Sequence, residues 1–182
     1  MNFYLEFEKY RDGQLVSKHS EPAHSWTSLG WARMLKYFML LDGVSITSIT
    51  GFSGEAGNHS KGILIGSSDK AFDFNEITLD SQLVIPATET EEHDYALEYM
   101  DTVVQPVEYD VSTKKWTTRI KRGFYVISSH LGGANVIVKE IGLAEVDSLV
   151  WARDILAAPI TIEPLDTLYI TYIIHTDMSE ID

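Results

Sequence analysis

The chain has 182 residues and carries 14 Lys and Arg against 27 Asp and Glu, a formal net charge of −13. This length suits one domain, and a chain of this size buries roughly 70% of its unfolded surface, so it can hold a core without covalent staples. The acidic balance argues against nucleic-acid binding, which draws on basic surface. The lack of cysteine excludes disulfides, thiolate zinc sites and cysteine nucleophiles.

Targeting signals are not expected. The N-terminus has neither the basic region nor the apolar core of a secretion signal, and no apolar run approaches the ~18 residues of a membrane span. We therefore expect no membrane span. The absence of cysteine suits a cytosolic protein or a particle assembled in the cytosol.

The first 20 residues are predicted to form a hairpin arm. Residues 3–10 and 15–18 are the two strands, joined through Arg11-Asp12-Gly13, because Asp-Gly supplies the positive φ of a tight turn. Two strands alone are marginally stable, so the arm should lie on the main sheet or on a neighbouring subunit.

Residues 25–41 are predicted to form a helix. Ser25 can cap its N-terminus, and Asp42-Gly43 can end it. The segment is apolar almost all round, which indicates burial on more than one side, between the sheet and either the arm or another protomer. One broad face carries Trp26, Leu29, Arg33, Lys36, Tyr37 and Leu40, and the opposite side carries Trp31, Met34, Leu35, Phe38 and Met39.

The middle of the chain is predicted to alternate short strands with loops. Strands are expected at 44–50, at 62–66 between two glycines, and around 83–85, with a loop at 51–60 and an acidic loop at 88–94. Residues 97–109 and 115–127 should then form a long hairpin about 110–113. Its core face would carry Trp116, Thr118, Ile120, Phe124 and Val126.

The C-terminal third holds four apolar, β-branched runs, at 119–127, 135–143, 149–156 and 167–175. In the last run Leu168, Ile170, Tyr172 and Ile174 alternate with Tyr169, Thr171, Ile173 and His175, the period of a strand with one buried face. Short strands at roughly ten-residue spacing indicate a sandwich or barrel. We predict a single mostly β domain over residues 1–182. It is an antiparallel β-sandwich, jelly-roll-like, spanning 44–176, with the buried N-terminal helix (25–41) and the β-hairpin arm (1–20).

One basic cluster interrupts the acidic composition. On the strand predicted there, Arg119 and Lys121 share one face and Arg122 lies on the other. We interpret the cluster as a solvated strand face, with contact to an acidic partner subunit as the alternative. Its members are Lys114, Lys115, Arg119, Lys121 and Arg122.

The sequence offers no strong catalytic or metal-binding motif. Glycines 51, 54 and 57 lack the helix and the Gly-Lys-Ser/Thr of a phosphate loop, and residues 67–70 match S-x-x-K without its helix or Lys-Thr-Gly strand. The six histidines show no zinc spacing, although His19 and His24 could meet across a turn. The acidic loop 89–94 lacks the alternation of a calcium site, so a solvated loop is favoured. We expect no catalytic residue, cofactor or metal, and we assign no ligand-binding residue.

Two stretches resemble tailed-bacteriophage virion proteins. The first runs Gly62-Ile63-Leu64-Ile65-Gly66-Ser67-Ser68, then Asp80-Ser81-Gln82-Leu83. The second runs Val136-Ile137-Val138-Lys139-Glu140-Ile141-Gly142-Leu143, Trp151-Ala152-Arg153-Asp154-Ile155-Leu156, Pro159-Ile160-Thr161-Ile162 and Leu168-Tyr169-Ile170-Thr171-Tyr172. His24-Ser25-Trp26 before an apolar helix also fits. Leu165-Asp166 departs from the pattern, which has glycine before the last strand.

The resemblance implies a β-rich part of a tail, neck, baseplate or fibre, and its motifs are structural. We expect Gly142 to mark a strand bend or a close backbone approach, Arg153-Asp154 to form an ion pair, and Pro159 to lie at a sheet edge or turn.

The predicted function is therefore assembly. The chain would be a non-enzymatic structural component of a virion built in the host cytoplasm, a homo-oligomer that also binds other virion proteins. The alternative is a carbohydrate- or receptor-binding module that uses exposed aromatic side chains such as Trp116 or Tyr125. Core packing is the simpler account for at least three of the four tryptophans. A hydrolase ranks third.

Overall fold

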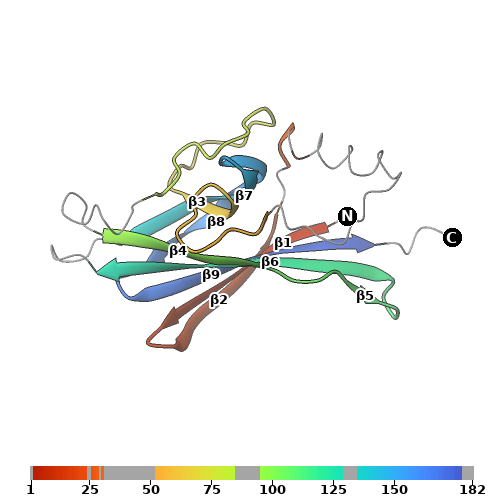
Figure 1. Ribbon diagram of the computed structural model, residues 1–182, viewed down its shortest axis with the longest axis horizontal. Coiled ribbons are helices and arrows are strands. Elements are labelled where there is room, and N and C mark those ends of the chain that lie inside the picture. Colours follow the sequence, from red (N-terminus) through yellow and green to blue (C-terminus); the bar gives the residue numbers. More distant parts are fainter. Residues whose placement is uncertain are drawn as a thin grey trace.

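The computed structural model describes residues 2–23, 26–28, 30, 52–84, 95–128 and 135–177. This part of the chain is mostly β and forms two antiparallel sheets (Figure 1). The larger sheet contains β1 (Asn2–Arg11), β2 (Gln14–Pro22), β4 (Tyr95–Val104), β5 (Glu108–Asp110), β6 (Lys115–Ser128) and β9 (Asp166–Asp177). The smaller sheet contains β3 (Gly62–Gly66), β7 (Val136–Val146) and β8 (Leu149–Ile162).

The strand order brings distant parts of the chain together. The larger sheet runs β2-β1-β9-β6-β4, with β5 also paired to β6, and the smaller sheet runs β3-β7-β8. In Figure 1 the long strands of the larger sheet lie side by side along the molecule, with β3, β7 and β8 on one side of them. The first and last strands of the chain are thus neighbours in the middle of the larger sheet.

The predicted hairpin arm is confirmed. Asp12 and Gly13 form its turn with φ of 49° and 74°, and β1 and β2 extend further than the sequence suggested. β1 pairs on its other side with β9, from Asn2 opposite His175 to Arg11 opposite Asp166. The arm therefore belongs to the main sheet.

The alternation predicted for the last strand is confirmed. Leu168, Ile170 and Tyr172 of β9 are buried and Ile174 is partly buried, whereas on the other face Tyr169, Ile173 and His175 are partly exposed and only Thr171 is buried. Side chains from both sheets share one hydrophobic core: Leu5 and Phe7 join it from β1, and β3 and β7 add their own apolar residues. The remaining C-terminal strands are also confirmed, with β8 continuing through Pro159 to Ile162.

The long hairpin is present but interrupted. β4 ends at Val104, and the partner of β6 resumes only as the three-residue β5. Pro106 lies in the gap, where it cannot donate a ladder hydrogen bond. Of the five residues expected on the core face of β6, all are buried but Trp116, which is 41% exposed because it lies beyond the core, opposite β5.

The helix predicted for residues 25–41 is not seen. Most of that segment lies outside the described residues. Within its described part, Trp26 forms an isolated bridge with Ala152, and the Thr27 N–H donates to the Trp151 carbonyl at 2.8 Å, so residues 26 and 27 lie along the edge of β8. The strand predicted at 44–50 also lies outside the described residues. Of the strand predicted around 83–85, Leu83 lies outside the named strands, although its N–H donates to the carbonyl of Ile65 in β3.

Candidate functional site

The S-x-x-K match at residues 67–70 lies in a loop and not on a helix. The Lys70 ammonium pairs with Glu76 and, at 3.4 Å, with Asp80. The hydrogen bond to Glu76 raises the pKa of Lys70, which keeps the amine protonated. A protonated, paired lysine does not supply the base that a serine nucleophile needs.

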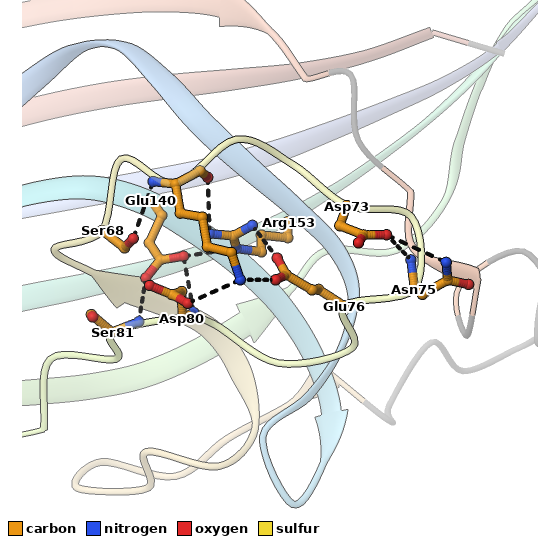
Figure 2. A network of polar contacts seen from close by, with 9 residues as sticks. Ser68, Asp73, Asn75, Glu76, Asp80, Ser81, Glu140 and Arg153 are labelled. Carbon is orange, nitrogen blue, oxygen red and sulfur yellow. Dashed lines mark hydrogen bonds and ion pairs between the residues drawn. The ribbon is translucent and has the colours of Figure 1, made fainter.

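A buried ion pair lies beneath this loop (Figure 2). The Arg153 Nε donates to Glu140 Oε2 at 2.8 Å, and both side chains are fully buried. Arg153 Nη1 reaches Glu76 at 2.8 Å, and Glu140 Oε1 accepts from the Ser81 N–H at 2.8 Å. Gly66 makes room for this pair, because an added Cβ would lie 2.6 Å from Glu140 Cγ. The cluster ties the loop to the smaller sheet.

The ion pair predicted between Arg153 and Asp154 is therefore wrong. Adjacent residues of a strand point to opposite faces, so Arg153 meets Glu140 while Asp154 accepts a hydrogen bond from the buried Tyr172 hydroxyl. The close approach predicted at Gly142 comes from side chains, since an added Cβ would lie 2.6 Å from Val150 Cγ1 and 2.9 Å from Leu79 Cδ2.

Arg122 corrects the prediction of a solvated basic cluster. Arg119 and Lys121 lie on the outer face as expected, but the Arg122 side chain is fully buried on the core face. Its guanidinium donates to five backbone carbonyls and lies 4.8 Å from the ring centre of Tyr99. Burial lowers its pKa to about 10. The carbonyls belong to Glu55, Asn58, Lys61, Ile63 and Met100.

This arginine explains the glycine-containing loop. Four of the five carbonyls lie in residues 55–63, which include Gly57 and follow the loop's first glycines. The loop predicted there is confirmed over its described residues. The Arg122 side chain holds this loop by donating hydrogen bonds to its backbone carbonyls, and the loop lacks the sequence motif of a phosphate or nucleotide site.

The histidines do not meet in the described part of the chain. His19 stacks on Phe7 at 6.0 Å between ring centres, and its Nε2 lies 3.3 Å from Glu21. Burial, with the charges of Arg119 and Lys115, lowers the pKa of His175. Among the residues that the structure describes, no cluster of three metal-ligating side chains occurs. His24, His93 and His130 and the acidic loop 89–94 lie outside those residues.

Exposed aromatic side chains in the described part of the chain include Tyr4, Phe74, Tyr109 and Trp116. Tyr109 and Trp116 pack together at the β5–β6 end, with ring centres 4.6 Å apart. Trp151 and Trp26 instead lie in or against the core, and Trp31 is outside the described residues. Tyr125, predicted from the sequence as a candidate for ligand binding, is half-buried and lines a hollow on the outer face of the larger sheet.

The hollow has a volume of about 680 Å³. Three neighbouring strands form its floor: Thr167 of β9 lies between Tyr10 of β1 and Tyr125 of β6, and Tyr169 follows two residues along β9. The β1–β2 turn and the turn before β9 close one end, through Asp12, Gly13 and Leu165. Of the residues that line the hollow, only Tyr125 was predicted from the sequence as a candidate for ligand binding. The sequence does not reveal the strand order β1-β9-β6 that brings the others to it.

Among the described residues, loop segments bond to three of the four sheet edges, in part or along most of their length. Along β4, the Thr102 N–H donates to Gly54 O at 2.7 Å, and beyond it β5 has only three residues. Residues 81 and 83 bond to Ser67, just after β3, and to Ile65 of β3, each at 2.9 Å. Along β8, residues 77 and 27 bond only to Val150 and Trp151 at its start, and Pro159, as predicted, lies on this edge strand.

The fourth edge is β2. Its residues are exposed except for the partly buried Glu21, and they include Leu15 and Val16, each 51% exposed. Within the described ranges, no backbone hydrogen bond reaches β2 from outside the β1 ladder. A strand edge of this kind presents unpaired donors and acceptors that can pair with another chain.

Comparisons with protein families, with curated proteins and with solved structures find no match to this chain. None of the described residues belongs to a helix with the length and apolarity that crossing a membrane requires.

Proposed function

We propose that this protein is a structural component of a tailed-phage virion, and that it works by assembly through the open edge of β2. The single observation that supports assembly most is the contrast between this edge and the three edges to which loops bond. Natural sheets blunt exposed edges with loops, charged side chains, prolines and short strands. Here loops bond to β4, to β3 and to the start of β8, while β2, although it carries Lys18 and ends at Pro22, has eight exposed residues and no loop bonded to it in the described part of the chain.

The partner we propose for β2 is the β2 strand of a second copy. A surface that meets its own copy across a two-fold axis closes after two subunits, whereas a ring needs two different surfaces. Among the described residues, β2 is the one long edge strand to which no loop bonds, which favours the two-fold arrangement. The two strands would run antiparallel and join the larger sheets of both copies.

The phage assignment rests on the resemblance of residues 62–83 and 136–172 to virion proteins. In this chain those residues include buried structural positions: Glu140, Arg153 and Tyr172 are fully or almost fully buried, and Gly66 accommodates Glu140. A resemblance concentrated in such positions concerns the fold and not a reaction. It supports a place in a tail, neck, baseplate or fibre, among other virion proteins.

For the fold we propose a two-layer sandwich. The shared hydrophobic core, with side chains from β1, β3, β6 and β7 in one cluster, supports two sheets packed face to face. The jelly-roll connectivity stays a prediction.

Single cysteines test the proposed pairing directly, because the chain has none of its own. We would place them at Ser17, His19 or Ser20 of β2, and at Val103 of the covered β4 edge as the control. Residues near a two-fold axis between antiparallel strands have Cα atoms about 4.5–5.5 Å apart, within disulfide range. We expect at least one β2 variant to form covalent dimers under mild oxidation, and the Val103→Cys control to stay single. Dimers in neither set, or equally in both, would contradict pairing through β2.

Membership of the particle needs a separate experiment. An antibody against this chain should label the tail, neck, baseplate or fibres of purified virions in electron micrographs. Intact virions without the chain would contradict the phage assignment, while the cysteine experiment would still report on assembly.

A further inference from the structure

We propose that the hollow between Tyr10, Tyr125 and Tyr169 binds a neutral saccharide. This inference goes beyond assembly and does not depend on it, since the hollow lies on the face of the larger sheet and the proposed pairing uses the edge of β2. Its volume of about 680 Å³ falls within the range of small-molecule sites.

The aromatic walls are held in place by their neighbours. Tyr10 and Tyr169 pack edge to face with ring centres 5.6 Å apart. Tyr169 lies over Gly123, where an added Cβ would be 2.9 Å from the ring, and the Lys121 ammonium lies 4.6 Å from its centre. Thr167 has a short side chain between the larger Tyr10 and Tyr125, which leaves the depression open.

The closed end of the hollow is also fixed. Arg11 connects its two turns, with Nε 2.7 Å from Asp166 Oδ1 and Nη2 2.6 Å from Glu163 Oε2. Asp12 and Leu165, which line this end, both have positive φ, of 49° and 69°. A site whose walls are already ordered loses less entropy when a ligand binds.

The lining favours a neutral polyhydroxylated ligand. Tyrosine rings offer flat apolar faces to the C–H face of a sugar ring, and their hydroxyls can hydrogen-bond to sugar hydroxyls. Asp12 adds a carboxylate acceptor and Thr167 a hydroxyl. The lining contains no Lys or Arg. The nearby Lys121 and Arg11 are paired with carboxylates, Lys121 with Glu8 and Arg11 with Asp166 and Glu163, so their charges are already balanced and do not favour a phosphate or a sulfate. A quaternary ammonium ion could also bind among tyrosines, but the open hollow is far larger than one such group.

The experiment is a binding screen of the full chain, read out by saturation-transfer NMR. The ligands are neutral mono- to tetrasaccharides of glucose, galactose, mannose and N-acetylhexosamines. Choline chloride is tested in parallel. We expect millimolar or tighter binding of at least one saccharide. Tyr125→Ala should weaken it by about tenfold or more, because a stacking face is lost, whereas Tyr125→Phe keeps the face and most of the binding.

Tyr109→Ala is the matched control, because Tyr109 is an exposed tyrosine outside the hollow. It should leave binding unchanged, and thermal unfolding checks that every variant is folded. Three results would overturn the proposal: no saccharide binds, only choline binds, or Tyr109→Ala removes binding while Tyr125→Ala does not.

Discussion

The Nε atom of Arg153 lies 2.8 Å from Oε2 of Glu140, and neither side chain is exposed to solvent. The pair connects β7 and β8 inside the smaller sheet, and its remaining hydrogen bonds reach the loop that covers β3. A buried pair of this kind fixes the position of a loop more than it adds stability.

Breaking this pair should be costly. We expect Arg153→Met to lower the free energy of unfolding by about 3–5 kcal/mol, since Glu140 would stay buried without its partner. Urea unfolding measures the change. The control is Lys139→Met, next to Glu140 on β7. It removes the exposed contact with Asp69 and should cost about 1 kcal/mol or less. Equal losses in the two variants would contradict the role assigned to Arg153.

Arg122 should be as important to the loop at residues 55–63. Arg122→Met would leave up to five carbonyls without a donor, so we expect a loss of about 3 kcal/mol or more in the free energy of unfolding. Amide hydrogen exchange of this loop should also become faster.

Arg119 provides the control for Arg122. It lies three residues earlier on β6, is partly exposed and pairs with Glu108. Arg119→Met should change stability little and leave exchange in the loop as it was. Protection of residues 55–63 that survives in Arg122→Met would show that the loop is held by other contacts.

The lowered pKa of Asp166 leads us to predict that the stability of the fold depends on pH. Burial raises the pKa of Asp166, but the hydrogen bonds from Arg11 and from the Glu163 backbone, with the charges of Arg11 and Lys9, lower it more, so the net shift is downward from 3.8. A carboxyl whose pKa is lower in the folded state stabilises the fold above its unfolded pKa, and that stabilisation is lost as the pH falls through the folded pKa.

The comparison of the protein with Asp166→Asn measures this effect. The difference in unfolding free energy should be largest near neutral pH and should shrink as the pH falls below about 4. Asp12→Asn, the same carboxylate-to-amide change in the neighbouring β1–β2 turn, is the matched control. A difference for Asp166→Asn that is constant from neutral to acid pH would contradict the assignment to Arg11.

Local patterns predicted those features that local chemistry determines. The alternation of residues 167–175 identified β9 and its buried face, and Asp12-Gly13 identified the first turn because few other dipeptides adopt two positive φ angles. Trp116 was placed on the correct face of its strand but assigned to the core. Its exposure depends on where the other sheet ends, which a single strand does not reveal.

Features that depend on strand order were missed. Arg122 was assigned to a solvated cluster because charged residues are usually exposed, and the carbonyls that receive it lie about 20–70 residues away in sequence. The tyrosine hollow needs β9 between β1 and β6, an order in which the first strand meets the last. The partner of Arg153 was misassigned to its neighbour in sequence, although neighbours in a strand point apart.

The central claim is assembly through β2, and light scattering across a wide concentration range tests it most directly. We predict a dimer, with twice the 20.5 kDa mass of the chain, or a larger particle built from such dimers. Val16→Lys should shift this species to the single chain, because an added charge on an edge strand opposes pairing. Val103→Lys, at a similarly exposed valine on a covered edge, should leave it intact. A single chain at every concentration, or an oligomer that Val16→Lys leaves unchanged, would contradict the account.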